Sequence, residues 1–148
     1  MKATCSIYLK LLALVLVLAL TIPIPTLAVS NDAAVPYASY YLDAYNTYIC
    51  NMGNGNIQIW YEVAGTRYMD EIGVLSIILY ESSDNSTWTR VKTFSHENYS
   101  SMLIQDDNYH CSYVSYQGST GKYYKAYVCI WAGKNGAGDT RYMWATMV

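Results

Sequence analysis

The chain has 148 residues, a formal net charge of −2 and 14% charged residues. Because it has no basic cluster, it lacks the phosphate-neutralising charge of nucleic-acid-binding proteins, and attraction to an anionic membrane surface is disfavoured for the same reason. A chain of this length is expected to form one domain.

The first 28 residues have the three parts of a secretory signal peptide. Lys2 and Lys10 mark a positive segment, residues 11–20 are an unbroken apolar run, and small residues flank Leu27 as at a cleavage site. The apolar run is about half the length needed to span a bilayer, so a retained anchor is the weaker interpretation. We expect a secreted, extracellular protein with no membrane attachment after cleavage. Removing 28 of the 148 residues leaves a mature chain of 120, with seven basic and eleven acidic residues.

The remainder alternates with the period of two that is typical of strands. Residues 29–37 are small and polar and predict a flexible lead-in. Turn residues at 51–56, 65–67 and 82–86 separate the first runs, and residues 72–80 are apolar on both phases, which indicates a strand covered on both faces. The predicted strands are residues 40–50, 57–63, 72–80, 87–94, 109–116, 123–132 and 140–148.

Seven short strands without an amphipathic helix predict an all-β fold for residues 38–148. We expect an antiparallel two-sheet sandwich, immunoglobulin-like or fibronectin-III-like. Tyr124 enters the penultimate run just after Gly121, where such sandwiches place a corner tyrosine, although tyrosine also simply suits strands. The predicted core comprises Trp60, Leu75, Ile77, Leu79, Tyr124, Ala126, Val128 and Ile130.

A set of turn glycines, a strand tryptophan and a Gly-x-Tyr-Tyr strand entry resembles a family of small secreted proteins from Gram-positive bacteria, classed as a domain of unknown function. The resemblance implies secretion and a β-sandwich, and it carries no activity or functional residue. The residues that carry it are Tyr41, Leu42, Gly53 to Gly55, Asp70 to Val74, Trp88, Val91 and Gly121 to Ala126.

The cysteines leave two alternatives open. Cys5 departs with the signal peptide, so Cys50, Cys111 and Cys129 remain. If runs 109–116 and 123–132 pair as a hairpin, Cys111 and Cys129 lie opposite each other and can form a disulfide. If the connection crosses between sheets, the two lie apart and stay reduced.

No pattern of catalytic or metal-ligating residues emerges. His110 neighbours Cys111, but adjacent strand residues point to opposite faces, so the pair is not a dyad. The acidic pairs 70–71 and 106–107 splay apart in the same way. The spacing of the acidic residues does not match an EF-hand, and the spacing of the cysteines and histidines does not match a zinc site. We expect no catalytic residue, metal or cofactor, although a cleft joining Cys50 to a histidine would revive a small hydrolase.

The remaining signal is aromatic. All four tryptophans and sixteen of the 17 tyrosines follow residue 28. Tyr123, Tyr127 and Trp131 are predicted to share one strand face, and Tyr41 and Tyr45 one face of another strand. Flat rings on a sheet stack on sugars or anchor a protein partner, although they also serve cross-strand packing.

The sequence therefore favours a non-enzymatic binding module. The expected ligand is a cell-surface glycan or a protein partner, and nucleic acid is not expected. The first alternative is a structural protein that assembles through an exposed edge strand, residues 87–94 or 140–148. The second alternative is the small hydrolase.

Overall fold

The computed structural model describes residues 39–147, and this part of the chain is all-β and antiparallel, as predicted. The predicted signal peptide and the predicted lead-in, residues 29–37, both lie outside the described residues. Within the described range, no helix is long or apolar enough to cross a membrane. The elements are β1 (Leu42–Gly53), β2 (Asn56–Ser82), β3 (Thr89–Ser95), the 3₁₀ helix η1 (Ser100–Met102), β4 (Leu103–Gln117), β5 (Tyr123–Lys134) and β6 (Ala137–Thr146).

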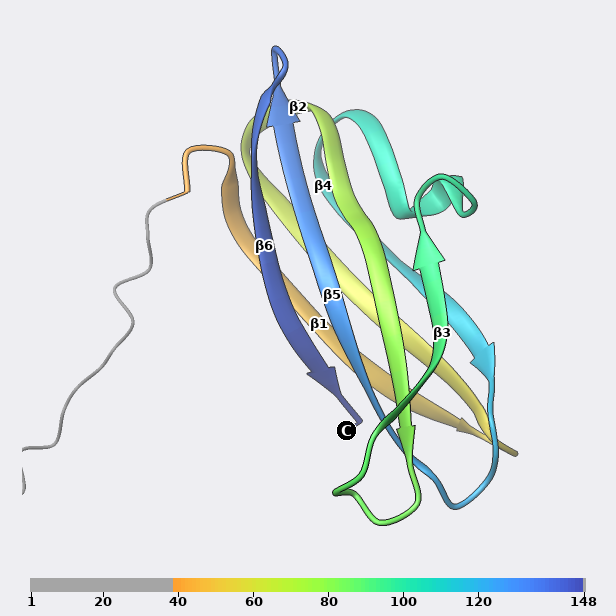
Figure 1. Ribbon diagram of the computed structural model, residues 1–148. Coiled ribbons are helices and arrows are strands. Elements are labelled where there is room, and N and C mark those ends of the chain that lie inside the picture. Colours follow the sequence, from red (N-terminus) through yellow and green to blue (C-terminus); the bar gives the residue numbers. More distant parts are fainter. Residues whose placement is uncertain (1–38, 148) are drawn as a thin grey trace, which may run out of the picture. The chain divides into compact units, whose positions relative to one another are not determined.

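One hydrogen-bonded sheet contains all six strands. Its path is β1-β2-β5-β6, and β3 and β4 also pair with β2. β2 bends near the β5–β6 hairpin tip, so that its two halves run in opposite directions (Figure 1). The sheet therefore curls into a half-barrel, whose inner side holds the buried apolar residues of both halves.

β1 and β6 lie side by side in the same direction, joined near both ends. Ile49 forms a parallel bridge with Met147 at one end. At the other end, the Asp139 carboxylate accepts hydrogen bonds from the Ser39 hydroxyl and, at 3.0 Å, from the Tyr40 backbone N–H. These bonds hold the pKa of Asp139 below its usual range, with the Ser39 bond contributing most. The contacts bring the entry into β1 against the last hairpin.

Two predicted strands are joined in β2. The predicted break at residues 65–67 does not interrupt the strand, because the chain entering β1 hydrogen-bonds to it. The backbone N–H of Thr66 donates to the Tyr41 carbonyl at 2.9 Å, and its hydroxyl donates to the Tyr40 carbonyl at 2.8 Å. These bonds keep the segment extended, so the seven predicted runs become six strands.

The second half of β2 is apolar on both phases, but the reason is not that both of its faces are covered, as predicted. Its register with β5 shifts between Val74 and Ser76, which inserts one extra residue and reverses the alternation. Ile72 and Val74 before the shift and Ile77 and Leu79 after it are all buried. The apolar residues of both phases therefore all point to the inner side of the sheet. Leu75 lies at the shift and is only half-buried.

Most of the predicted core is confirmed. Six of the eight side chains are buried: Ile77, Leu79, Tyr124, Ala126, Val128 and Ile130. Trp60 is half-buried rather than core, because the inward phase of its strand carries Tyr61 and Val63. Its ring lies on the outer side between Tyr48 and Tyr113, at centroid distances of 6.4 and 4.7 Å.

Tyr124 makes the backbone contact expected of a corner tyrosine. Its hydroxyl accepts a hydrogen bond from the Ser119 backbone N–H at 2.8 Å and donates to the Glu81 carboxylate at 2.6 Å. Gly118 leaves the necessary room, since a Cβ there would collide with the Tyr124 hydroxyl. One side chain therefore joins the β4–β5 connection to the end of β2.

The disulfide between Cys111 and Cys129 is absent, because β4 and β5 do not form a hairpin. They pair with opposite edges of β2, so that Cys111 lies opposite Glu62 and Cys129 opposite Ser76. The hairpin alternative is therefore wrong. The connection runs from one edge of β2 to the other within a single sheet rather than between two sheets, and the two cysteines lie apart. Cys50, Cys111 and Cys129 are free thiols, exposed at Cys111 and buried at Cys129.

Candidate functional site

A cluster of aromatic rings covers the outer side of β2, β5 and β6. Tyr127 lies 4.9 Å from Trp144 and 5.5 Å from Tyr142 between ring centroids, and the rings of Tyr127 and Tyr142 are nearly parallel at 10°. Tyr80 joins from β2, 5.7 Å from Trp144. Tyr142 and Trp144 are 59% and 49% exposed. We call these four residues the aromatic face.

Lys125 lies at one border of the aromatic face and contacts two tryptophan rings. The Lys125 Nζ atom lies 4.3 Å from the ring centroid of Trp88 and 4.8 Å from that of Trp144. A cation over two ring faces is attracted by both ring quadrupoles. This contact favours one orientation of Trp144 before any ligand arrives.

The structure places the predicted β5 stripe on the outer side. Tyr123, Tyr127 and Trp131 alternate with inward residues that are buried, and Tyr123 is 48% exposed. Only Tyr127 belongs to the ring cluster, since Trp131 lies towards the hairpin tip. Sequence reasoning missed Tyr142 and Trp144, although their two-residue spacing in the last predicted strand was a usable signal.

Tyr41 and Tyr45 do not form a common surface. A register shift between Leu42 and Ala44 interrupts the alternation between them. Tyr41 packs against the edge of the core, whereas Tyr45 borders a cavity of about 130 Å³ shared with Tyr109. The prediction that these two rings share one strand face is wrong, because it assumed an unbroken period of two.

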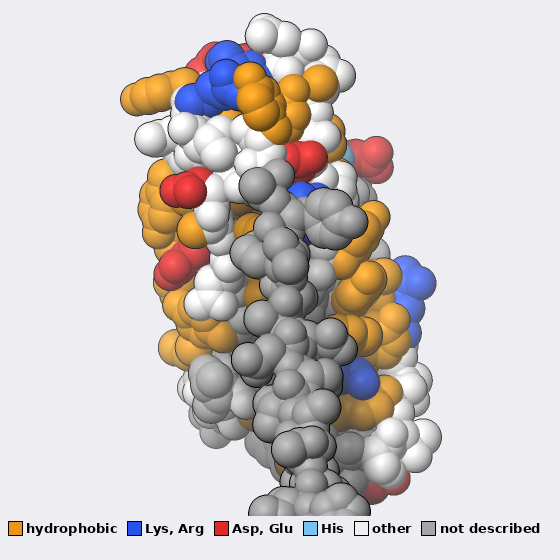
Figure 2. All heavy atoms as spheres, turned by 90° about the vertical axis from the view of Figure 1, so that its left-hand side faces the viewer, with side chains coloured by type: hydrophobic (Ala, Val, Ile, Leu, Met, Phe, Trp, Pro, Cys, Tyr) orange, Lys and Arg blue, Asp and Glu red, His pale blue; other side chains and the backbone are white. Residues whose placement is uncertain are grey.

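A second group of rings lies on the outer side of β1, β4 and the first half of β2. It consists of Tyr48, Trp60 and Tyr113, which are opposite one another in register. The Trp60 indole N–H donates to Gln58 Oε1 at 3.1 Å. Figure 2 shows hydrophobic side chains on both flanks of the molecule. The continuous ladder across three strands is typical of cross-strand packing.

A recess opens where the β5–β6 hairpin tip meets the bend of β2 and the start of β4. Its volume is about 510 Å³, and its lining includes Glu71, Gln105, Asp106, Trp131 and Lys134. We call it the tip recess. Trp131 is thus a predicted site residue that the fold places in a cavity.

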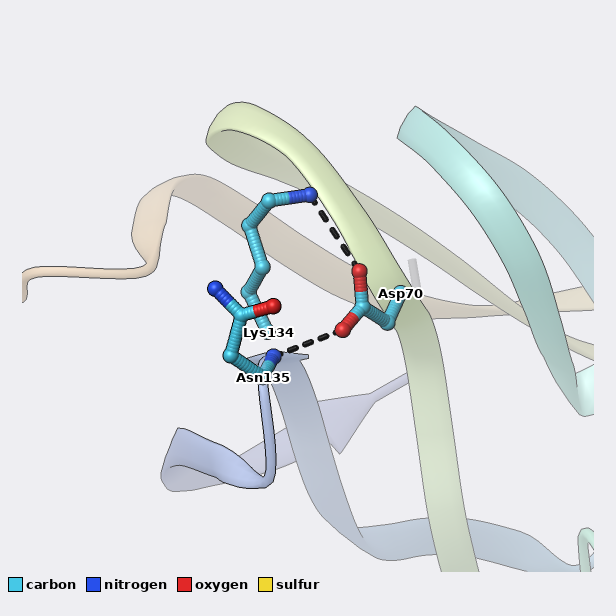
Figure 3. Close-up of polar contacts among 3 residues, drawn as sticks. All are labelled: Asp70, Lys134 and Asn135. Carbon is cyan, nitrogen blue, oxygen red and sulfur yellow. Dashed lines mark hydrogen bonds and ion pairs between the residues drawn. The ribbon is translucent and has the colours of Figure 1, made fainter.

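An ion pair fixes one wall of the tip recess. Lys134 Nζ lies 3.2 Å from Asp70 Oδ1, and the Asn135 backbone N–H donates to Asp70 Oδ2 at 2.6 Å (Figure 3). The bond from Asn135, followed by that from Lys134, lowers the pKa of the Asp70 carboxyl. These contacts tie the hairpin tip to β2.

Within residues 39–147, His110 and Cys50 do not form a catalytic pair. His110 is buried on the inner side, and its Nε2 donates to the Ser101 carbonyl at 2.8 Å, which also accepts a bond from the Tyr61 hydroxyl. Cys50 pairs with Gln58 on the outer phase of β1. The two residues therefore lie on opposite sides of the sheet.

The carboxylates of the acidic loops either accept hydrogen bonds from the protein itself or lie apart from one another. Asp84 accepts hydrogen bonds from the backbone N–H groups of Ser86 and Thr87 at 2.9 and 2.8 Å, which hold the pKa of its carboxyl well below its usual range. Within residues 39–147, no three His, Cys, Asp or Glu side chains are grouped closely enough to hold a metal ion.

Comparison with known proteins gives limited similarity. No family model and no curated protein matches the chain, so its resemblance to a family of unknown function stays a prediction. Similar solved structures include Spo0M, a sporulation control protein from Bacillus subtilis, at 9% identity and a TM-score of 0.42. They also include a family 76 glycoside hydrolase from a bovine Bacteroides thetaiotaomicron strain, at 14% identity and a TM-score of 0.30. Each covers 72% of this chain, which spans 49% of the first protein and 20% of the second.

Proposed function

We propose that this chain is a secreted, non-enzymatic module that binds a cell-surface glycan through its aromatic face. The observation that carries the proposal is the packing of Tyr80, Tyr127, Tyr142 and Trp144 into one partly exposed surface. The signal-like first 28 residues support secretion.

Ring geometry favours a sugar over an elongated apolar ligand. Stacked rings offer flat faces against the C–H side of a sugar ring, and their hydroxyl and indole N–H groups bond with sugar hydroxyls. Lys125 adds a fixed cation at the border. A binding surface held by rigid side chains loses little conformational entropy when the ligand docks.

We also propose that the curled sheet is a form of the immunoglobulin-like sandwich. Two features support this: the hydrogen bond of Tyr124 to the upstream backbone and the bend that divides β2 into two halves. Such a scaffold presents outer sheet faces for binding.

Truncating the exposed rings tests the proposed function. The double variant Tyr142→Ala/Trp144→Ala should lower affinity for a captured glycan at least about tenfold, since removing aromatic anchors typically costs more than about 1 kcal/mol each. The matched control is Tyr68→Ala, an exposed tyrosine at 64% outside the aromatic face. A glycan array should identify the ligand, and titration calorimetry should measure the loss. Equal binding by the double variant and the wild type would reject the aromatic face as the binding surface.

Assembly through an edge strand is the second candidate. β3 pairs only with β2 among the described strands, so one of its edges is unpaired, whereas β6 ends the path of the sheet but lies beside β1. Such an unpaired edge can accept a further strand. Sedimentation velocity over a wide concentration range separates the candidates, because a chain that stays monomeric is not an assembly protein.

A further inference from the structure

We propose that the tip recess binds one amino-sugar unit whose nitrogen is free and protonated. The inference rests on the proposed glycan-binding function and adds a second contact site with its own chemistry. The recess belongs to the same outer side of β5 as the aromatic face, since Trp131 and Tyr127 share its outward phase. Four residues of strand separate them by about 13 Å, so one glycan chain can reach both.

Two glycines lie against the Trp131 indole, and one of them, Gly133, also lines the tip recess. Gly133 and Gly138 face each other across β5 and β6, and the Trp131 indole lies over both. A Cβ on Gly133 would come within 2.6 Å of the indole Cζ2 atom, and one on Gly138 would also clash with the ring. Neither glycine has a positive φ, so backbone conformation does not require them. Their role is to seat the indole flat.

The indole N–H of Trp131 lacks a hydrogen-bond partner within residues 39–147. Its Nε1 atom is buried and has no acceptor among the described residues. A buried donor without a partner destabilises a fold, and a phenylalanine would avoid that loss, although its smaller ring fills less of the space. Residues that weaken stability locally are concentrated at functional sites. The large flat ring of Trp131 is thus explained by a ligand that stacks on it.

The walls carry uncompensated negative charge. Glu71 lies in register with Gly133 on one side and Gln105 on the other. Glu71 and Asp106 are exposed, and no ion pair engages either carboxylate within the described residues. Lys134 is already paired with Asp70. Two free carboxylates beside an aromatic ring favour a cation and repel an anion.

An amino sugar matches this combination. Its C–H side stacks on the indole, its ammonium lies between the two carboxylates, and Gln105 is available for a hydroxyl. The recess volume of about 510 Å³ lies within the usual range of ligand sites, roughly 300–1,000 Å³. There is room for the amino sugar and part of its neighbour in a chain.

Calorimetry with three oligosaccharides of equal length tests the inference on the full mature chain. The probes are β-1,4-linked tetramers of glucosamine and of N-acetylglucosamine and the α-1,4-linked tetramer of galacturonate, which are cationic, neutral and anionic. We expect glucosamine to bind at least about tenfold more tightly than N-acetylglucosamine, and galacturonate to bind least. The variant Glu71→Gln/Asp106→Asn should remove that preference while leaving the neutral tetramer within about twofold.

Matched variants keep the result interpretable. Asn suits position 106 because the backbone there has φ 54°, a conformation that Asn also tolerates. Glu97→Gln, an exposed carboxylate outside the recess, is the charge control and should change nothing. Trp131→Phe should weaken both binding ligands and keep the fold, which circular dichroism and thermal melting verify.

The possible failures are distinguishable. If no glycan binds, the proposed function and this inference both fall. If glycans bind through Tyr142 and Trp144 without a preference for glucosamine, only the tip recess proposal falls. If a lysine-containing peptide displaces glucosamine and itself binds more tightly, the recess is a protein-binding site and the amino-sugar assignment is wrong.

Discussion

At the scale of single residues, Tyr124 shows how one hydroxyl connects distant parts of the chain. It links the Glu81 carboxylate at the end of β2 with the Ser119 backbone before β5. The side chain is only 3% exposed, so water cannot replace these partners. Buried polar groups left without a partner are costly, which makes the hydroxyl testable by its removal.

Tyr124→Phe should lower the free energy of unfolding by about 1–3 kcal/mol, because it leaves the Ser119 N–H and the Glu81 carboxylate without a partner. Urea denaturation followed by tryptophan fluorescence measures the change. The control is Tyr116→Phe, which alters the neighbouring ring 6.3 Å away and should have little effect. A loss no larger than that of the control would show that the hydroxyl contributes nothing.

The same residue predicts a dependence on alkaline pH. Burial, followed by the hydrogen bond to Glu81, raises the pKa of Tyr124 from 10.0 to about 12. A raised tyrosine pKa means that the folded state favours the protonated form, so its stabilisation is complete below pH 10 and is lost as pH rises towards 12. Wild-type stability should therefore fall more steeply than that of Tyr124→Phe over this interval. Parallel curves in urea titrations would contradict the assignment.

At the scale of elements, β2 organises the fold because every other strand except β6 pairs with it. Gly73 lies in the second half of β2 with φ 145°, and a Cβ there would collide with the Met102 carbonyl oxygen. The close approach of η1 to β2 thus depends on the missing side chain.

Gly73→Ala should destabilise the protein by more than about 2 kcal/mol, since it combines an unfavourable φ with a backbone clash. Gly121→Ala is the matched control, because Gly121 has φ 74° with open space around it, and its loss should be about 1 kcal/mol. Thermal or urea unfolding of both variants separates the clash from the effect of φ. Equal losses would mean that η1 moves aside without cost.

At the scale of the whole molecule, one experiment tests both the cleavage of the signal peptide and the oxidation state of the cysteines. Mass spectrometry of secreted protein, alkylated under denaturing and non-reducing conditions, should show a chain starting at Val29 with three labelled cysteines. Four labelled cysteines would mean that the signal peptide is retained, and one would mean that a disulfide has formed. In the native protein, exposed Cys111 should react before Cys129, which is buried and whose thiol pKa is raised by that burial.

Wherever a strand keeps a constant period of two, the alternation of residues along it was sufficient to predict which side chains point inward and which outward. In β5, Ala126, Val128 and Ile130 point inward and Tyr127 outward, as predicted. It failed where the period changes, at the register shifts beside Leu42 and Val74, because an extra residue reverses every later side chain. Tyr45 and Leu75 were misplaced for this reason.

The sequence by itself determined the strand-rich fold class, the approximate strand positions and the outward stripe of β5, since these depend on neighbouring residues. Only the tertiary structure decided that β2 is continuous, that β4 and β5 lie on opposite edges of it and that Cys111 and Cys129 are apart. It also assembled the aromatic face from three strands and brought Glu71, Asp106 and Trp131 around one recess. Strand partners and register depend on contacts between residues far apart in the chain, and no local pattern encodes them.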